Sequence, residues 1–415
     1  MTGSTPAPGE APAPRGGLTY VLGATVVAGA IGYVIQAVVP GFITAQEYVA
    51  FGVFWSVVYL VVSALSGIQQ ELARASHSGD GSGWPVFRTF ALVCAAGAAV
   101  LVAVTSPLWA ARVFPSDTLT LVAALAFAAL GYALVAAVSG ALYGVRNWPG
   151  VAGMTVSDAA LRLIAVIVAL VAGAGLTALG WAVAVPFLAA AVIVWAFTGR
   201  SVVRSLALDA DLRGLGRNSV RTVGAAIATG LMISGLPFLL GVTVQEDASA
   251  TLLASLILVI TLTRAPLIIP LLALQSYLIV SFRDAGHRVG RRVAVWGGGL
   301  AALTAVLALA AAFVGPWLID LLYSGRYELP PGAYAAIVAS AGLTGLLCIT
   351  GPAVLSEGRH TAYLAGWAAA SVVTVACLLV PLGPLERVLL SLLAGPVVGV
   401  VVHAVALARG SRVSG

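Results

Sequence analysis

The sequence predicts an all-α membrane protein in which about twelve helices cross the bilayer as two six-helix bundles. Hydrophobic residues make up 60% of the 415 positions and charged residues only 9%, whereas soluble domains are roughly half apolar and a quarter charged. Apolar windows of about 20 residues follow one another, and each is long enough to cross roughly 30 Å of hydrocarbon. The arginines between these windows alternate between a rich and a poor side, as membrane topology requires.

Helices are the only economical spanning element here, because a lipid-facing backbone must satisfy its own hydrogen bonds and no window alternates like a barrel strand. An even number of crossings places both ends of the chain on one side. In chain order, the predicted spans are 18–39, 48–71, 86–110, 118–143, 151–173, 177–198, 219–242, 250–281, 292–314, 332–355, 361–381 and 386–408.

The arginines predict the orientation. All 21 basic residues are arginine; sixteen lie on the side of the two termini and two, Arg162 and Arg264, lie inside spans. The opposite side holds Arg112, Arg326 and Arg387. By the positive-inside rule, both termini are expected in the cytoplasm of a bacterium, with the protein in its inner membrane. Because the arginines are explained as topology signals, no nucleic-acid partner is expected.

The chain divides by composition. Residues 1–17 are rich in Pro, Ala and Gly and lack the basic start and apolar run of a signal peptide, so we expect a disordered cytoplasmic tail. A six-helix bundle is expected over 18–198, a cytoplasmic linker over 199–218, a second bundle over 219–408 and a short cytoplasmic tail over 409–415.

Short matches between the halves indicate an internal duplication. SPLWAARVF at 106–114 resembles GPWLIDLLY at 315–323, and Arg146 holds the place that Arg359 holds, with offsets of 209 and 213 residues. With an even number of spans in each half, the repeats would be parallel and related by an axis along the membrane normal.

Several chemistries are not expected from the sequence. Cys94, Cys348 and Cys377 fall in apolar spans without the paired spacing of a metal site or disulfide framework, so we expect no metal and no cofactor. No glycine loop of the G-x-x-x-x-G-K-[ST] kind is present, which excludes an ATPase of that type within this chain. Energy is therefore expected from an ion gradient, from substrate supply or from a partner.

Charged side chains inside the bilayer are the best functional pointers, because each is costly unless it faces a partner or a watery cavity. Arg264 lies inside the eighth predicted span, just before Pro266 and Pro270, which each remove a helix hydrogen bond. One interpretation is that Arg264 faces a central cavity and binds the phosphate of an anionic cargo. The alternative is a structural arginine that bonds the carbonyls of a neighbouring helix.

The fifth span carries Asp158 and Arg162, which lie four residues apart, share a helix face and can form an ion pair. A structural pair is favoured over a role in gating or substrate binding. Gln36 and Gln275 also lie in spans and could bond sugar hydroxyls, although such residues more often join helices. Pro237, in the seventh span, marks a break comparable to those at Pro266 and Pro270, and we predict hinges at all three.

Residues 37–75, AVVPGFITAQEYVAFGVFWSVVYLVVSALSGIQQELARA, resemble the start of the polysaccharide flippases of the multidrug/oligosaccharidyl-lipid/polysaccharide exporter superfamily. In the second half, GPWLIDLLYSGRYELPPGAYAAIVAS and PAVLSEGRHTAYLAGW look like later stretches of that family. The seventh and eighth spans lack the charged pattern that many transporters of this superfamily carry. The resemblance implies two bundles in a V-shaped fold. The matching residues are Pro40, Gln46, Glu47, Tyr48, Phe51, Gly67, Gln69, Glu71 and Arg74.

The resemblance also implies a function and its partners. It favours a flippase that moves a lipid-linked oligosaccharide or polysaccharide precursor across the cytoplasmic membrane by alternating access. Its partners would be the lipid-linked sugar, the bilayer and cell-envelope glycosyltransferases, and it would act as a monomer.

Three alternatives stay open. One is a cation-coupled multidrug or metabolite antiporter, for which Asp158 is the only acidic candidate inside a span. Another is a membrane-embedded glycosyltransferase or polymerase, although such enzymes generally need a larger outer loop than the connection at 315–331, so no enzyme activity is expected. The third is a scaffold without transport activity.

Overall fold

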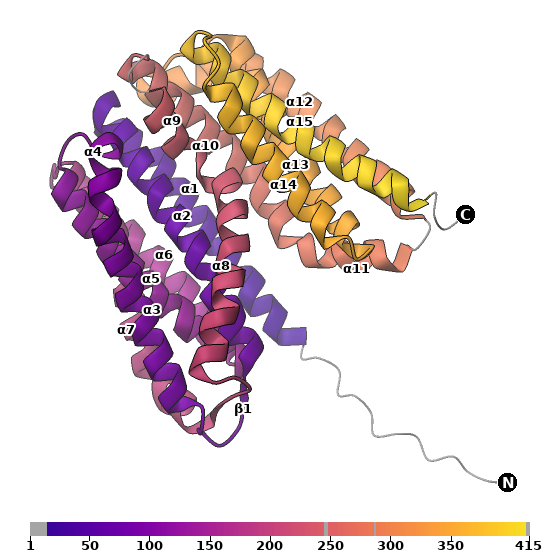
Figure 1. Ribbon diagram of the computed structural model, residues 1–415. Helices are drawn as coiled ribbons and strands as arrows, with labels where there is room; N and C mark the ends of the chain where they lie inside the picture. Colours follow the sequence, from indigo (N-terminus) through magenta and orange to yellow (C-terminus); the bar gives the residue numbers. More distant parts are fainter. Residues whose placement is uncertain (1–14, 245–247, 286–287, 412–415) are drawn as a thin grey trace.

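A computed structural model of the chain describes residues 15–244, 248–285 and 288–411 (Figure 1). Nearly all of the described chain is helical. The first elements are α1 (Arg15–Phe42), α2 (Ala45–Ala75), β1 (Ser76–Ser78), α3 (Trp84–Thr105), η1 (Ser106–Leu108), α4 (Ala110–Val113), α5 (Thr118–Gly144), α6 (Trp148–Val171), α7 (Leu176–Ser205) and β2 (Leu206–Leu208). The later elements are α8 (Leu212–Ser234), α9 (Leu236–Thr243), α10 (Ala250–Ala273), α11 (Gln275–Ala285), α12 (Val289–Tyr323), α13 (Pro331–Ser356), α14 (His360–Leu378) and α15 (Pro384–Ser411).

The predicted all-α membrane fold is confirmed. Among the described residues, eleven helices are long and apolar enough to cross a membrane. The seventh predicted span, 219–242, is not among them because a break at Gly235 divides it into α8 and α9. The eighth predicted span, 250–281, is likewise divided at Leu274 into α10 and α11. Both breaks lie after the predicted linker, in the segment from α8 to α11.

The helices form a V. Figure 1 shows α1–α7, in indigo to magenta, as one group and α11–α15, in orange to yellow, as another; the two groups approach at one end and diverge toward the other. We call them the first group and the second group. Helices α8, α9 and α10 lie between them (Figure 1).

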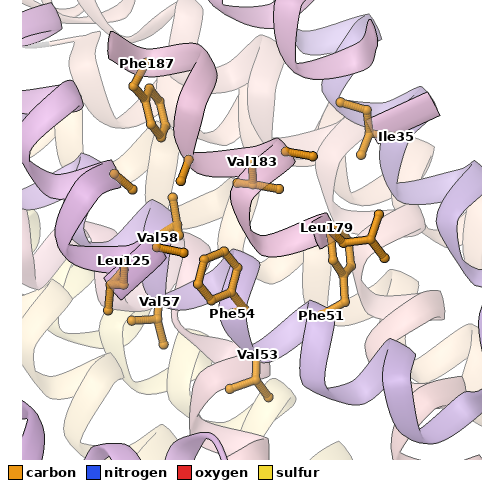
Figure 2. Packing of buried hydrophobic residues seen from close by; sticks show 14 of the residues in the cluster. Ile35, Phe51, Val53, Phe54, Val57, Val58, Leu125, Leu179, Val183 and Phe187 are labelled. Carbon is orange, nitrogen blue, oxygen red and sulfur yellow. The ribbon is translucent and has the colours of Figure 1, made fainter. Parts of the chain in front are cut away.

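The core of the first group is built around α2. Figure 2 shows Phe51 and Phe54 of α2 among apolar side chains that include Leu125 of α5 and Leu179 of α7. All four of these side chains are buried. On its other side α7 exposes Phe197, which is 86% accessible and suits a lipid-facing position. Packing therefore fixes α2 at the centre of the group, with one face left for the space between the groups.

The start of α2 is set by its own sequence. Thr44 and Glu47 form a capping box, in which the Glu47 amide donates to Thr44 Oγ1 at 3.3 Å and the Thr44 amide donates to Glu47 Oε2 at 2.9 Å. These bonds satisfy amides that the first turn of a helix leaves without partners. The turn from α1 to α2 is thereby held in one conformation.

Helix α8 packs closely against α2. The Thr222 hydroxyl donates to the Gly67 carbonyl at 2.9 Å. A Cβ atom at Gly67 would lie 2.5 Å from the Val223 backbone nitrogen, so only glycine permits this approach. A two-stranded antiparallel ladder of β1 and β2 joins the ends of α2 and α7, with Ser76 opposite Leu208.

The connections differ from the expected loops. Within the predicted linker 199–218, α7 continues to Ser205, β2 follows and α8 begins at Leu212, so only residues 209–211 lie outside helix and strand. The division of the chain into two bundles at this point stays a prediction. Of the predicted tail 1–17, residues 1–14 lie outside the described residues and α1 already begins at Arg15. Helix α15 extends to Ser411, and 412–415 lie outside the described residues.

The turns after α5 and α13 share one geometry, which the turn after α6 also has at Gly173, so this common helix ending leaves the internal duplication a prediction. The Asn147 amide donates to the Leu142 carbonyl at 2.8 Å, and the Arg359 amide donates to the Val354 carbonyl at 3.2 Å. Arg146 has φ 57° and Gly358 has φ 74°. The structure therefore pairs Arg146 with Gly358, one residue away from the pairing with Arg359 that the sequence suggested.

Candidate binding cavity

A cavity of about 540 Å³ lies between the first group of helices and the segments α8–α10. Its volume falls within the range of about 300–1,000 Å³ that is usual for small-molecule sites. Helices α1, α2, α5, α6, α8, α9 and α10 all contribute to its wall. The polar and aromatic side chains in the wall are Thr25, Tyr33, Gln36, Trp55, Ser56, Tyr59, Gln69, Tyr132, Ser139, Tyr143, Thr155, Asp158, Arg162, Ser234, Thr261 and Arg264.

Arg264, on α10, lies in this wall and is 9% exposed. Its Nη2 donates to Thr344 Oγ1 of α13 at 3.1 Å. The side chain thus contacts the second group on one side and the cavity on the other. Arg264 thus bonds a hydroxyl of a neighbouring helix and also lies in the cavity wall, and its role stays a prediction.

Asp158 and Arg162 form the ion pair that their spacing predicted. Arg162 Nη2 lies 2.5 Å from Asp158 Oδ1. Arg162 Nη1 donates to the Tyr59 hydroxyl at 3.1 Å, its Nε donates to the Val183 carbonyl at 3.3 Å, and its guanidinium lies 4.3 Å from the centre of the Phe187 ring. These contacts hold the guanidinium in one place and neutralise its charge locally. They favour the structural role for the pair, with Asp158 as the more exposed partner at 19% against 4%.

Gln36, on α1, is 8% exposed and also lines the cavity. Its Oε1 atom has no hydrogen-bond partner among the described residues. A buried acceptor without a donor is costly, so a donor supplied by a ligand would stabilise this oxygen, and ligand binding at Gln36 stays a prediction. Gln275 is different: it begins α11, beyond the break at Leu274, and is outside the set of cavity-lining residues.

The three predicted hinge prolines occupy different surroundings. Pro237 lines the cavity and stands in the first turn of α9, directly after the break at Gly235. Pro266 and Pro270 lie inside α10, which continues past both to Ala273. The interruption therefore follows four residues after Pro270, at Leu274, rather than at either proline. Hinge motion at these positions stays a prediction.

A serine of α2 bridges the break between α8 and α9. Ser56 Oγ donates to the Ser234 carbonyl at 2.5 Å and accepts from the Phe238 amide at 3.2 Å. In an unbroken helix the Phe238 amide would donate directly to the Ser234 carbonyl, four residues earlier. The Ser56 hydroxyl is thus inserted into the hydrogen-bond ladder, which is a recognised cause of helix kinks. Sequence reasoning missed Ser56, because nothing in α2 marks it as the partner of a distant break.

The cavity also has an aromatic wall that the sequence did not single out. The rings of Trp55 and Tyr59 stack with their centres 4.9 Å apart, and Tyr132 and Tyr143 line the same space. Trp55 and Tyr59 are four residues apart on α2, a spacing that places them on one helix face. That spacing could have identified this pair of aromatic side chains from the sequence. Among the described residues, no group of three His, Cys, Asp or Glu side chains is arranged to hold a metal.

Comparison with solved structures identifies the class of fold. The chain superposes with a TM-score of 0.70 on a multidrug-resistance transporter of the MATE family, from the MOP superfamily, in its inward-facing conformation, at 13% identity over 96% of this chain and 100% of that one. For an outward-facing conformation of such a transporter the TM-score is 0.61. For the lipid II flippase MurJ, in an inward closed conformation, it is 0.65, at 9% identity over 94% of this chain and 87% of that one. The chain has the V-shaped fold of these MOP-superfamily proteins.

The chain belongs to a family represented in mycobacteria. It is 31% identical to protein Rv3630 and 32% identical to protein Rv1510 of Mycobacterium tuberculosis, in each case over 98% of this chain and 95% of the relative. Protein Mb3654 of Mycobacterium bovis is 32% identical over the same shares. No model of a known protein family matches the chain. The comparisons therefore support the fold of the MOP superfamily, but they do not reach the polysaccharide flippase family that the sequence motifs suggested.

Proposed function

We propose that this protein is a membrane transporter that moves an amphipathic cargo with an anionic, hydroxyl-rich head group, such as a lipid-linked oligosaccharide, from one side of the membrane to the other. The observation that carries the proposal is the joint presence of Arg264 and of Gln36, whose Oε1 has no hydrogen-bond partner among the described residues, in the wall of one cavity between the first group and α8–α10. A guanidinium suits a phosphate, and a buried amide oxygen suits a sugar hydroxyl.

The rest of the wall suits the same cargo. Trp55 and Tyr59 present stacked aromatic faces, and much of the remaining lining is aliphatic or glycine from α1. Helix α1 is little buried along its length, so one of its faces is available to lipid while another lines the cavity. A lipid tail could therefore remain in the bilayer while the head group occupies the cavity.

The proposal includes the membrane in which the protein lies and the partners that supply its cargo. The arginine distribution supports the inner membrane of a bacterium with both termini in the cytoplasm. The cargo would then be supplied at the cytoplasmic side by enzymes that assemble sugars on a lipid carrier, and the chain would act as a monomer.

A cation-coupled antiporter is the second candidate, and one observation favours it. Asp158 is a carboxylate in the cavity wall, with its Oδ1 bound by Arg162 and its side chain 19% exposed. A carboxylate beside aromatic rings can bind a cationic drug, and exchange of a proton or metal ion at the same carboxylate can couple transport to a gradient. In this reading Asp158, rather than Arg264, contacts the cargo.

Reconstitution decides between the candidates. Purified protein in liposomes should move a fluorescent lipid-linked oligosaccharide between leaflets, measured by the fraction that a membrane-impermeant reductant bleaches. Arg264→Gln should slow this movement about ten- to a hundredfold, because a hydrogen bond between a charged group and a phosphate contributes about 1.5–3 kcal/mol. Arg88→Ala is the matched control, since Arg88 is an exposed arginine outside the cavity.

Each outcome points to one candidate. If wild-type protein leaves the labelled oligosaccharide in its original leaflet, the lipid-linked cargo is wrong. Efflux of a cationic dye driven by a proton or sodium gradient, and abolished by Asp158→Asn, would establish the antiporter instead.

A further inference from the structure

The turn between α12 and α13 is bound to the end of α1, although almost 300 residues of chain separate them. The Tyr323 hydroxyl donates to the Ala37 carbonyl at 2.7 Å and the Tyr327 hydroxyl donates to the Pro40 carbonyl at 3.0 Å. Arg326 Nη1 donates to the Pro40 carbonyl at 3.3 Å and to the Ile43 carbonyl at 3.0 Å. Four hydrogen bonds thus join the second group of helices to the first.

These bonds satisfy groups that a helix end leaves open. The last four carbonyls of an α-helix have no acceptor role within the helix, and Pro40 is in the last turn of α1, which ends at Phe42. A cation near these carbonyls is also favoured by the helix dipole. Arg326 therefore caps α1 from the other group of helices. The Ile43 carbonyl and the Thr44 amide belong to one peptide unit, and this amide donates to Glu47 in the capping box of α2. The capping box therefore also holds the Ile43 carbonyl in position.

The contact is closed to water at its centre. Tyr327 is 1% exposed and Tyr323 is 6% exposed. The rings of Tyr323 and Tyr327 meet edge to face with centres 5.4 Å apart, and the Tyr327 ring meets Tyr48 of α2 at 6.0 Å. Arg326 differs, because its side chain is exposed and its bonds compete with water. The contact thus has a dry aromatic centre that excludes water and a solvated rim. Because the bonds at the rim already compete with water, the two groups of helices can still separate here.

Helix α1 connects this contact to the cavity. Gln36 lines the cavity, and the next residue, Ala37, supplies the carbonyl that accepts from Tyr323. A ligand that displaces the backbone of α1 at Gln36 shifts the same helical turn. The two sites therefore act on one rigid element, which is the physical requirement for coupling between them.

We propose that the α12–α13 turn is the gate that closes the cavity on the side of Arg326, and that α1 couples cargo binding at Gln36 to release of this gate. The inference rests on the proposed transport function only in that the protein must open alternately to its two sides. Because the arginine pattern places Arg326 on the outer side, the described state is closed outward.

Cysteine labelling tests the gate without any cargo. Cys94, Cys348 and Cys377 are replaced by alanine, and Val39→Cys serves as the reporter, since Val39 lies between the accepting carbonyls of Ala37 and Pro40 and is fully buried. Right-side-out vesicles are treated with a membrane-impermeant maleimide. The labelling rate should rise about tenfold when Tyr323→Phe and Arg326→Ala are combined, because three of the four bonds are lost and the open state gains population.

Arg112→Ala is the control, because Arg112 is an exposed arginine of α4 on the same predicted side. An unchanged labelling rate in the double variant, or an equal rise in the Arg112 variant, would overturn the gate. Tyr323→Phe alone keeps the ring and should raise the rate about threefold, so the test survives if the double variant does not fold.

The coupling has its own readout. The labelled lipid-linked oligosaccharide used for reconstitution should raise the labelling rate of Val39→Cys when Gln36 is present. In a variant that also carries Gln36→Ala, the oligosaccharide should leave this rate unchanged. An equal change in both variants would separate the gate from Gln36. If the oligosaccharide is not transported at all but the double variant still labels faster, the cargo proposal fails and the gate stands.

Discussion

Two arginines reach the same cavity with different partners. Arg162 is bound by the Asp158 carboxylate, the Tyr59 hydroxyl and the Val183 carbonyl. Arg264 instead donates to the neutral hydroxyl of Thr344. An internal carboxylate neutralises the Arg162 guanidinium, which favours a structural role for Arg162. Arg264 lies in the cavity wall, and its role in cargo binding stays a proposal.

The Asp158–Arg162 pair makes a sharp prediction about stability. Arg162→Met should destabilise the protein by about 3–5 kcal/mol, because it leaves a largely buried carboxylate without its cation. The double variant Asp158→Asn with Arg162→Met should recover a large part of that loss. Thermal unfolding of the purified variants in detergent measures both effects. Equal stability of the single variant and the wild type would mean that the pair is not structural.

The spacing of Asp158 and Arg162 was enough to predict their pairing, because residues four apart on a helix share a face. Gln36 lies in the cavity wall, whereas Gln275 is outside the set of residues that line it. The difference arises from the break at Leu274, which removes α11 from the path of α10. Tyr132 and Tyr143 could not be selected from the sequence, since aromatic residues in a span serve equally well against lipid.

Among the elements, the break between α8 and α9 does most to shape the cavity. Pro237 and Ser234 line the cavity on the two sides of the break, and Ser56 of α2 bridges it. A proline near the start of a helix is tolerated because its missing amide needs no partner there. The freed carbonyl of Ser234 receives its bond from Ser56 instead. The bend of the seventh span is therefore supported from the first group of helices.

Ser56→Ala tests this support. The variant should lose about 1–2 kcal/mol of stability, because two hydrogen bonds between helices disappear and bonds of this kind contribute modestly in membrane proteins. The control is Ser340→Ala, since Ser340 is equally buried but bonds only the Ile337 carbonyl of its own helix. Thermal unfolding in detergent should separate the two variants by several degrees. Identical midpoints would show that the Ser56 bridge does not hold the bend.

The sequence predicted the positions of the spans well, because hydrophobic length is a direct requirement of the bilayer. It did not predict that α12 would run unbroken from Val289 to Tyr323, well beyond the predicted end at residue 314. Pro316 falls inside that helix. Whether a proline bends or ends a helix depends on the groups that satisfy the freed carbonyls, and those groups come from elsewhere in the fold.

At the scale of the whole molecule, the cavity and the closed contact both depend on how the two groups of helices meet. The apolar composition restricts the chain to a helical bundle, so the fold class followed from the sequence. The hydrogen bond from Tyr323 to Ala37 joins residues that are 286 positions apart, so no local sequence pattern predicts it. Such contacts arise only when the V is assembled, which is why the gate could not be predicted from motifs.

The central claim is that the space between the helix groups holds a lipid-linked sugar. Photo-crosslinking tests it most directly, with benzoylphenylalanine placed at Tyr132 in the cavity wall and, as the control, at Val192, which is 60% exposed on α7. After irradiation in native membranes, mass spectrometry of the adducts should find phosphate-bearing glycolipid at position 132 and bulk phospholipid at position 192. Bulk phospholipid alone at both positions would contradict the account.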